Sequence, residues 1–179
     1  LAALAYAALE TCLSAPCTTT GGSSTPAEEQ YCVYSSCQAL LDMCYGASAL
    51  GEECSNPLVI DAVPFHTVAN TAGASNTFKV VPALCDGIGT ELGWETGEHL
   101  YEFTAPASGI YQVALTSQFD AALLVADSCQ RGYNACRDGA NASGAQGTEQ
   151  LTVSLSGGDS VFVVIEGVAG SAGPYTLSV

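Results

Sequence analysis

The sequence predicts a mainly β protein: an antiparallel β-sandwich of about eight or nine strands, preceded by an α-helical hairpin that disulfide bonds staple together. Residues 1–46 are rich in Ala and Leu, with apolar residues at helical spacing. After Cys54 the chain consists of short segments of alternating apolar and polar residues, separated by Gly, Asn, Asp and Ser. A charged fraction of only 12% beside 48% hydrophobic residues and 19 glycines is typical of a packed chain with many turns. We therefore expect a hairpin over residues 1–46, a linker over 47–53 and a sandwich over 54–179.

The hairpin begins with a helix over residues 1–13. The segment TPAE at residues 25–28 is a capping box with Pro at the first helical position, which satisfies the free amides at the start of a second helix. That helix runs to about Tyr45 and stops at Gly46. Its apolar face repeats at helical spacing through Val33, Cys37, Leu40, Leu41 and Cys44.

Two C-x4-C pairs stand on either side of the Thr/Gly/Ser tract in the hairpin loop. Residues in contact across an antiparallel hairpin have a constant sum of residue numbers. Cys12 and Cys37 share the sum 49 with Cys17 and Cys32, so nested bonds Cys12–Cys37 and Cys17–Cys32 fit two facing helices. A hairpin of this length has too small a core to stand alone, and each bond supplies about 2–4 kcal/mol.

Nine segments after Cys54 are strand candidates, because most of them alternate apolar and polar residues and turn-forming residues lie between them. They are LVIDAV (58–63), HTVAN (66–70), TFKVV (77–81), HLYEFTA (99–105), GIYQVAL (109–115), DAALLVA (120–126), TEQLTVSL (148–155), SVFVVIEG (160–167) and PYTLSV (174–179). No segment of helical period interrupts them.

Three segments after Cys54 follow one another in a distinctive order: LYEFTAPASGIYQVAL (100–115), FDAALLVADSC (119–129) and the stretch from GTEQ to TLSV (147–179). They contain a strand ending in Phe-Thr, then Pro, Gly-x-Tyr, an Asp-led strand, Glu-x-hydrophobic, Gly, a β-branched strand and a closing Tyr-x-Leu. In this order and spacing, residues 53–179 resemble the bacterial pre-peptidase C-terminal (PPC) domain. The resemblance implies a jelly-roll-like, non-catalytic sandwich on a secreted bacterial protein. Some relatives bind Ca²⁺ and some bind polymeric substrates; the hairpin lies outside the resemblance.

The resemblance also implies the disulfide bonds Cys54–Cys85 and Cys129–Cys136. With the hairpin bonds they account for eight of the nine cysteines, and Cys44 is left as a protected thiol or as a bond to another molecule. Its place on an apolar helix face favours burial. The alternative is a bond between Cys44 and Cys54 that leaves Cys85 free, because few residues separate the first two.

The charge of the chain excludes several classes of partner. Three basic residues against 18 acidic ones give a net charge of −15, which excludes nucleic acid and anionic lipid. The scattered cysteines include no C-x2-C pair and fit an oxidising compartment, so we expect a secreted or cell-surface protein. The chain starts at Leu1 without Met, as in a processed product or a fragment. The apolar run over residues 1–9 is far shorter than the ~20 residues of a membrane-spanning helix, and we expect no membrane span.

The acidic loop CDGIGTELGWETGEH (85–99) is a candidate calcium site. It carries Asp86, Glu91, Glu95 and Glu98 among glycines and other turn-forming residues, which would let carboxylates converge on a hard cation. Asp120, at the start of a strand candidate, would join the same site. Ca²⁺ is the single candidate cofactor. The alternative interpretation is a solvated loop, with Asp120 capping a turn.

No catalytic constellation occurs in the sequence. Motifs of the G-x-S-x-G, H-E-x-x-H and P-loop types are absent. His66 and His99 are the only histidines, and Glu102 would face away from His99 on a strand. We therefore expect no enzymatic activity. Trp94, beside Gly93 and Glu95, could stack against sugar, although a single Trp is more often a packing residue.

Two functional hypotheses follow. The first is a non-catalytic subunit of an extracellular assembly, structural or adhesive, for example a filament, in which the apolar first helix docks onto another copy or another extracellular protein. Its contact residues would be Leu1, Leu4, Tyr6 and Leu9. The alternative is an accessory module of a larger secreted hydrolase that binds polysaccharide or helps folding or secretion. An enzyme with unfamiliar carboxylate chemistry is a distant third.

Overall fold

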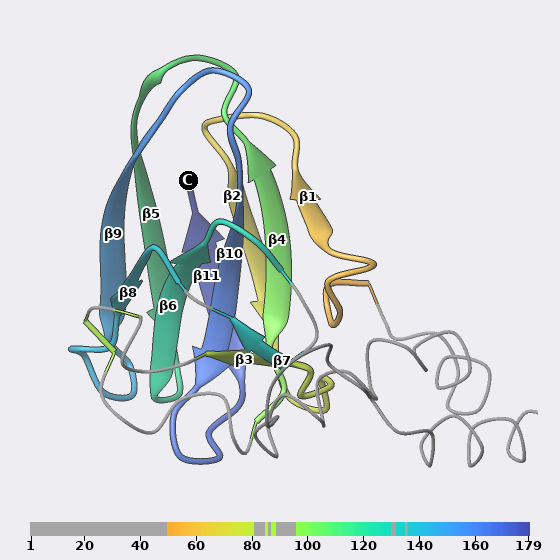
Figure 1. The fold of residues 1–179 in the computed structure, drawn as a ribbon. Coiled ribbons are helices and arrows are strands. Elements are labelled where there is room, and N and C mark those ends of the chain that lie inside the picture. Colours follow the sequence, from red (N-terminus) through yellow and green to blue (C-terminus); the bar gives the residue numbers. More distant parts are fainter. Residues whose placement is uncertain (1–49, 81–84, 86, 89–95, 130–131, 135) are drawn as a thin grey trace, which may run out of the picture. The chain divides into compact units, whose positions relative to one another are not determined.

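The computed structural model describes residues 50–80, 85, 87–88, 96–129, 132–134 and 136–179 (Figure 1). The chain divides into two units, Leu1–Ser48 and Ala49–Val179, and every described residue belongs to the second. Several predictions lie outside the described residues: the helical hairpin, the bonds Cys12–Cys37 and Cys17–Cys32, the fate of Cys44, and the contact residues Leu1, Leu4, Tyr6 and Leu9.

The described residues form a mainly β structure with eleven strands. They are β1 (Leu58–Ile60), β2 (His66–Asn70), β3 (Phe78–Val80), β4 (His99–Thr104), β5 (Gly109–Ser117), β6 (Ala121–Ala126), β7 (Gly132–Asn134), β8 (Asp138–Ala140), β9 (Thr148–Leu155), β10 (Ser160–Gly167) and β11 (Pro174–Ser178). The nine predicted strands are all present. The two strands that the sequence did not predict, β7 and β8, are three residues long and rich in turn-forming residues.

The strands form two sheets of a sandwich and a separate pair. The first sheet, sheet A, has the order β1-β4-β10-β6-β8, and the second, sheet B, has the order β2-β11-β5-β9 (Figure 1). Strands β3 and β7 form the separate pair. Six of the eight strand pairings are antiparallel, as predicted, whereas β1–β4 and β3–β7 are parallel. The mainly β sandwich predicted from alternation is confirmed, with these two parallel pairs as an addition.

One hydrophobic core fills the space between sheets A and B. Inward residues of both sheets meet there, among them Phe103, Leu123 and Ile165 of sheet A with Leu115 and Leu177 of sheet B. These side chains are at most 1% exposed. Alternation along each strand delivers them to one face, which is why the period-2 pattern predicted the strands.

A second core lies on the opposite face of sheet A. Leu100, Leu124 and Val164 of that face pack against Phe78 and Val80 of β3. The β3–β7 pair therefore covers part of sheet A as a third layer, and Figure 1 shows this pair crossing the sheet near one end. Strand β6 is consequently buried at all six positions, which explains its continuous apolar sequence AALLVA.

Two disulfide bonds tie the third layer to the sandwich, and they differ from the predicted pairs. Cys54 is bonded to Cys129 with a Cα–Cα distance of 5.3 Å, and Cys85 to Cys136 with 5.0 Å. The predicted bonds Cys54–Cys85 and Cys129–Cys136, and the alternative bond from Cys44 to Cys54, are wrong.

The strand arrangement gives the reason for this pairing. Strand β7 lies between Cys129 and Cys136, so one of these cysteines precedes the strand and the other follows it. Because β3 and β7 run parallel, the residues that follow both strands meet at the same end, and these include Cys85 and Cys136.

Candidate functional site

Two buried glutamates lie side by side on the face of sheet A beneath β3. The register of β10 on β4 places Ile165 opposite His99, so the next residues, Glu166 and Glu98, are also neighbours. Glu98 is 0% exposed and Glu166 is 1% exposed. Two carboxyl groups buried on neighbouring segments repel each other when both are ionised. These two carboxyl groups are therefore the main candidates for unusual acid–base behaviour in the described part of the chain.

One oxygen of Glu98 accepts three hydrogen bonds from the start of β3. The backbone amide of Thr77 donates to Oε1 at 2.5 Å, the Thr77 hydroxyl donates at 2.8 Å, and the amide of Phe78 donates to the same atom. The other oxygen, Oε2, is buried and has no hydrogen-bond partner among the described residues. A protonated carboxyl group keeps Oε1 as the acceptor and avoids a buried negative charge beside Oε2, which receives no hydrogen bond.

The partner carboxyl group, on Glu166, contacts Thr96. The Thr96 hydroxyl oxygen is 3.0 Å from Glu166 Oε1 and also 3.0 Å from the carbonyl oxygen of Gly167. A hydroxyl group has one hydrogen and can donate to only one of these oxygens. A protonated Glu166 can donate to Thr96 while Thr96 donates to Gly167, so protonation satisfies both contacts.

Two glycines make room for this crowded arrangement. A Cβ at Gly97 would lie 1.9 Å from the carbonyl oxygen of Ala74, and a Cβ at Gly167 would lie 1.8 Å from that of Ser171. Neither contact is tolerable, so both positions require glycine. The close approach at Gly97 brings the turn before β3 against Glu98, whose amide donates to Ser75.

The pKa values follow from this geometry. Burial raises the pKa of Glu98 from 4.5 to about 7, although its hydrogen bonds from Phe78 and Thr77 act in the opposite direction. Burial, and then the charge of Glu98, raise the pKa of Glu166 well above its usual value, against the smaller effects of Thr96 and Lys79. At neutral pH the pair therefore holds at least one proton.

A second polar cluster joins the two sheets. The Tyr175 hydroxyl of β11 is 2.7 Å from His99 Nδ1 and 2.8 Å from the Tyr101 hydroxyl. Burial lowers the pKa of His99, although the charge of Glu52 raises it, and burial raises the pKa values of Tyr101 and Tyr175. His99 is thus a neutral hydrogen-bonding group inside the sandwich. His66, the other histidine, lies exposed on β2.

The predicted calcium ligands are only partly described. Asp86, Glu91, Glu95 and the candidate stacking residue Trp94 lie outside the described residues. Glu98 faces Thr77 and Phe78 rather than solvent, and Asp120 lies in the turn before β6, where its carbonyl oxygen accepts from the amide of Val168. In the described part of the chain no three Asp, Glu, His or Cys side chains come close enough to hold a metal ion. The calcium site stays a prediction.

Sequence reasoning missed Glu166 and the threonines that contact the pair. Glu166 belongs to the strand candidate SVFVVIEG, and only its strand character was used. The signal that could have identified it is the alternation along the strand, since Glu166 falls on the same face as the half-buried Phe162 and the buried Val164. A carboxyl group on such a face needs a partner or a proton.

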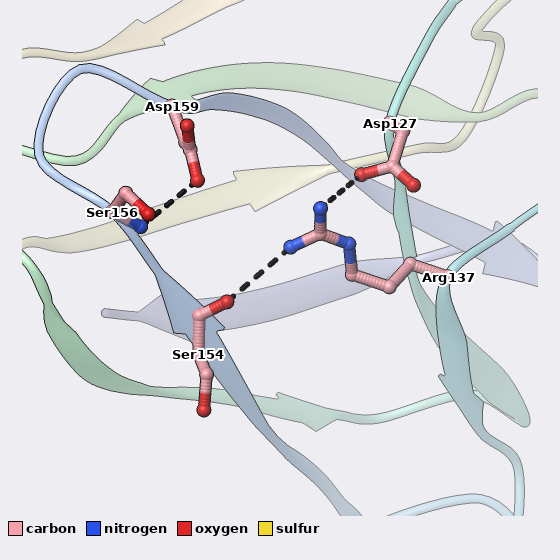
Figure 2. A network of polar contacts seen from close by, with 5 residues as sticks. All are labelled: Asp127, Arg137, Ser154, Ser156 and Asp159. Carbon is pink, nitrogen blue, oxygen red and sulfur yellow. Dashed lines mark hydrogen bonds and ion pairs between the residues drawn. The ribbon is translucent and has the colours of Figure 1, made fainter.

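An exposed ion pair at the edge of the sandwich is shown in Figure 2. Arg137 Nη2 is 2.5 Å from Asp127 Oδ1, and Arg137 Nη1 donates to the carbonyl oxygen of Ser154 at 3.4 Å (Figure 2). Ser154 belongs to β9 and Arg137 directly precedes β8, so the contact bridges the edges of the two sheets. Nearby, Asp159 accepts a hydrogen bond from the amide of Ser156 across the turn between β9 and β10.

Comparisons with known proteins give few matches. No family model matches the chain, and no curated protein matches it. Among solved structures, the pre-peptidase C-terminal domain of a collagenase from Bacillus anthracis matches with a TM-score of 0.44 and 10% identity, over 69% of this chain and 93% of that domain. PliG from Aeromonas hydrophila, a periplasmic inhibitor of g-type lysozyme, matches with a TM-score of 0.37 and 13% identity, over 68% of this chain and 92% of the inhibitor.

The first of these neighbours is a domain of the family that residues 53–179 resemble. At these TM-scores neither neighbour supports a statement about function, which has to rest on the residues of this chain. No helix in the described part of the chain is long and apolar enough to cross a membrane.

Proposed function

We propose that the protein is a secreted, non-catalytic subunit of an extracellular assembly, with a structural or adhesive role, for example in a filament. The sandwich would serve as a rigid body and the apolar amino-terminal helix as its docking element. The partner would be another copy of the chain or a different extracellular protein.

The observation that carries the proposal is the inaccessibility of the strongest acid–base pair. Glu98 and Glu166 have the raised pKa values that general acids require, but both are covered completely, so no substrate can reach them. His99 is held between Tyr175 and the sandwich interior. In the described part of the chain the two carboxyl groups with the most raised pKa values lie inside the fold, which suits a structural role better than a catalytic one.

The disulfide bonds support secretion and rigidity. They join residues 75 and 51 positions apart and fix a third layer onto the sandwich. Bonds of this kind persist in oxidising compartments and are rare in the cytosol. They also restrict the unfolded chain, which suits a protein that must stay folded outside the cell.

The docking role is tested by deleting residues 1–9, which removes the apolar contact residues and keeps Cys12. Light scattering should give a mass above 18.2 kDa for the parent protein and a mass close to that of one chain for the truncated protein. The control is Leu50→Ser, which removes an exposed leucine from the described part and should leave the mass unchanged. A parent protein that is already monomeric, or a truncation without effect, contradicts the proposal.

The accessory-module alternative has a different readout. It requires adsorption to a polysaccharide or protein fibre, weakened by Trp94→Ala. Adsorption of a monomeric parent protein would replace the structural proposal with this one.

A further inference from the structure

The outer face of sheet B carries no charged side chain. Alternation turns every second residue of β2, β11, β5 and β9 away from the core. Three residues on each of β2 and β11 point outward, and four on each of β5 and β9. These outward residues are Thr, Ser, Gln, Asn, Ala, Pro, Val, Ile and one His. The single acidic residue of these strands, Glu149, points inward and accepts hydrogen bonds from the amides of Ala142 and Ser143.

This neutral face has an ordered arrangement. Val68, Thr176, Thr116 and Thr148 stand side by side across all four strands. The hydroxyl groups of Thr116 and Thr148 are 2.9 Å apart. Two large apolar side chains extend from the face into solvent, since Val68 is 70% exposed and Ile110 is 77% exposed.

The other surfaces of the sandwich are less uniform and carry more charge than this neutral face. The outer face of sheet A is partly covered by the β3–β7 layer and its disulfide bonds. Acidic residues lie on that side and in the turns, among them Asp61, Glu102 and Asp127. At the edge of the neutral face, Arg137 reaches the Ser154 carbonyl oxygen, and its charge is balanced by Asp127 (Figure 2).

We propose that the outer face of sheet B is the contact surface for a second copy of this chain. Each copy carries a net charge of −15, so two copies repel each other in most orientations. The neutral face is the surface through which they can approach while their carboxylates stay apart. A face lined with hydroxyl and amide groups, which both donate and accept, can also hydrogen-bond to its own copy across a two-fold axis.

The size of the face predicts a weak contact. Four strands about 4.8 Å apart and about 25 Å long cover on the order of 500 Å² in plan, or about 1,000 Å² for two copies. This is near the lower limit for a specific interface. The contact does not involve residues 1–9, so it is separate from the docking role proposed above, although both concern assembly.

The test is the mass of the full chain as a function of concentration, up to about 1 mM because a small interface gives weak affinity. We expect the parent protein to self-associate, and added NaCl to strengthen the association by screening the like charges. Thr116→Lys should abolish it, because the contact would bury a strongly hydrated charge without a carboxylate partner on this face, although the substitution lowers the net repulsion between copies. Gln150→Lys, on the neighbouring strand β9, should act in the same way.

The matched control is Thr104→Lys. Thr104 is an exposed strand threonine whose hydroxyl is 2.7 Å from that of Ser160 across the strand pair, so its setting is like that of Thr116, but it lies on β4. We expect Thr104→Lys to associate at least as well as the parent protein. Circular dichroism checks that all variants are folded.

Three outcomes overturn the proposal. One is a parent protein that is monomeric throughout the concentration range. Another is association that Thr116→Lys and Gln150→Lys leave unchanged. The third is a monomer that adsorbs to an insoluble neutral polysaccharide through this face, shown by loss of adsorption in Thr116→Lys. Association that persists without residues 1–9 but is lost in Thr116→Lys supports this proposal and contradicts the docking role, and the reverse result supports the docking role alone.

Discussion

Replacing Glu98 with Gln tests whether the buried glutamate pair makes stability depend on pH. Glutamine has the same shape and keeps a carbonyl oxygen to accept from Thr77 and Phe78, but it cannot ionise. In the parent protein the folded state holds the Glu98 pKa at about 7 against 4.5 for an ordinary glutamate. At 1.36 kcal/mol for each pKa unit, this difference corresponds to about 3 kcal/mol.

The sign follows from proton linkage. Below about pH 4.5 the carboxyl group is protonated in both states, and it contributes its full stability to the folded protein. Between about pH 4.5 and pH 7 the unfolded chain loses the proton while the folded protein keeps it, so the free energy of unfolding falls as the pH rises. Above about pH 7 Glu98 is ionised in both states, and the free energy of unfolding falls no further on its account. Glu98→Gln should therefore unfold with similar free energy at about pH 4 and be more stable than the parent protein by about 3 kcal/mol at about pH 8.

The assay is urea denaturation followed by circular dichroism at several pH values, with EDTA present so that metal binding does not contribute. The control is Glu102→Gln, a half-buried glutamate on β4, the strand that follows Glu98, which should leave the pH dependence of the parent protein in place. If Glu98→Gln and the parent protein show the same change in free energy between about pH 4 and about pH 8, the assigned burial of a protonated Glu98 is wrong.

Four further predictions follow. Tyr175→Phe removes the hydroxyl that contacts both His99 and Tyr101 and should lower the free energy of unfolding by about 1–3 kcal/mol in urea denaturation, whereas an unchanged midpoint would contradict the hydrogen-bond assignment. Replacing Cys54 and Cys129 by Ser should cost about 4 kcal/mol, and mass spectrometry of non-reduced peptides should show these two residues linked. Arg137→Ala breaks an exposed ion pair and should lower the free energy of unfolding by less than about 1 kcal/mol in the same assay. A larger decrease would mean that the hydrogen bond from Arg137 to Ser154, which joins the two sheets, contributes more than the ion pair. Finally, a chelator should lower the melting temperature if the acidic loop holds Ca²⁺, and an unchanged melting temperature would remove that site.

The strands of this fold were predictable because their side chains alternate, and β5 and β9 show that pattern along their whole length. Strands β7 and β8 were not, because three residues such as GYN or DGA carry no period and pair only through distant partners. The correct disulfide pairs depend on the parallel β3–β7 pairing, which joins segments more than 50 positions apart. Spacing between cysteines contains no information about such a contact.

The candidate site was predictable only in part. The acidic loop pointed to Glu98, but as a calcium ligand with solvent access rather than as a buried acid. Its neighbour Glu166 is 68 positions away, and the two meet only because β10 pairs with β4. Which strands become neighbours is decided by the packing of the whole sandwich, so a local pattern could suggest one carboxyl group and not the pair.

The third layer has a consequence for the order of events during synthesis. Both of its disulfide bonds join a cysteine that precedes β4 to one that follows β6. Neither bond can close until residue 129 or residue 136 has left the ribosome, so these four cysteines emerge as free thiols. The face of sheet A that carries Leu100 and Val164 must also wait for β10 before β3 can cover it. A chain exported before folding would thus complete β-sheet assembly and oxidation together, in the compartment where it arrives.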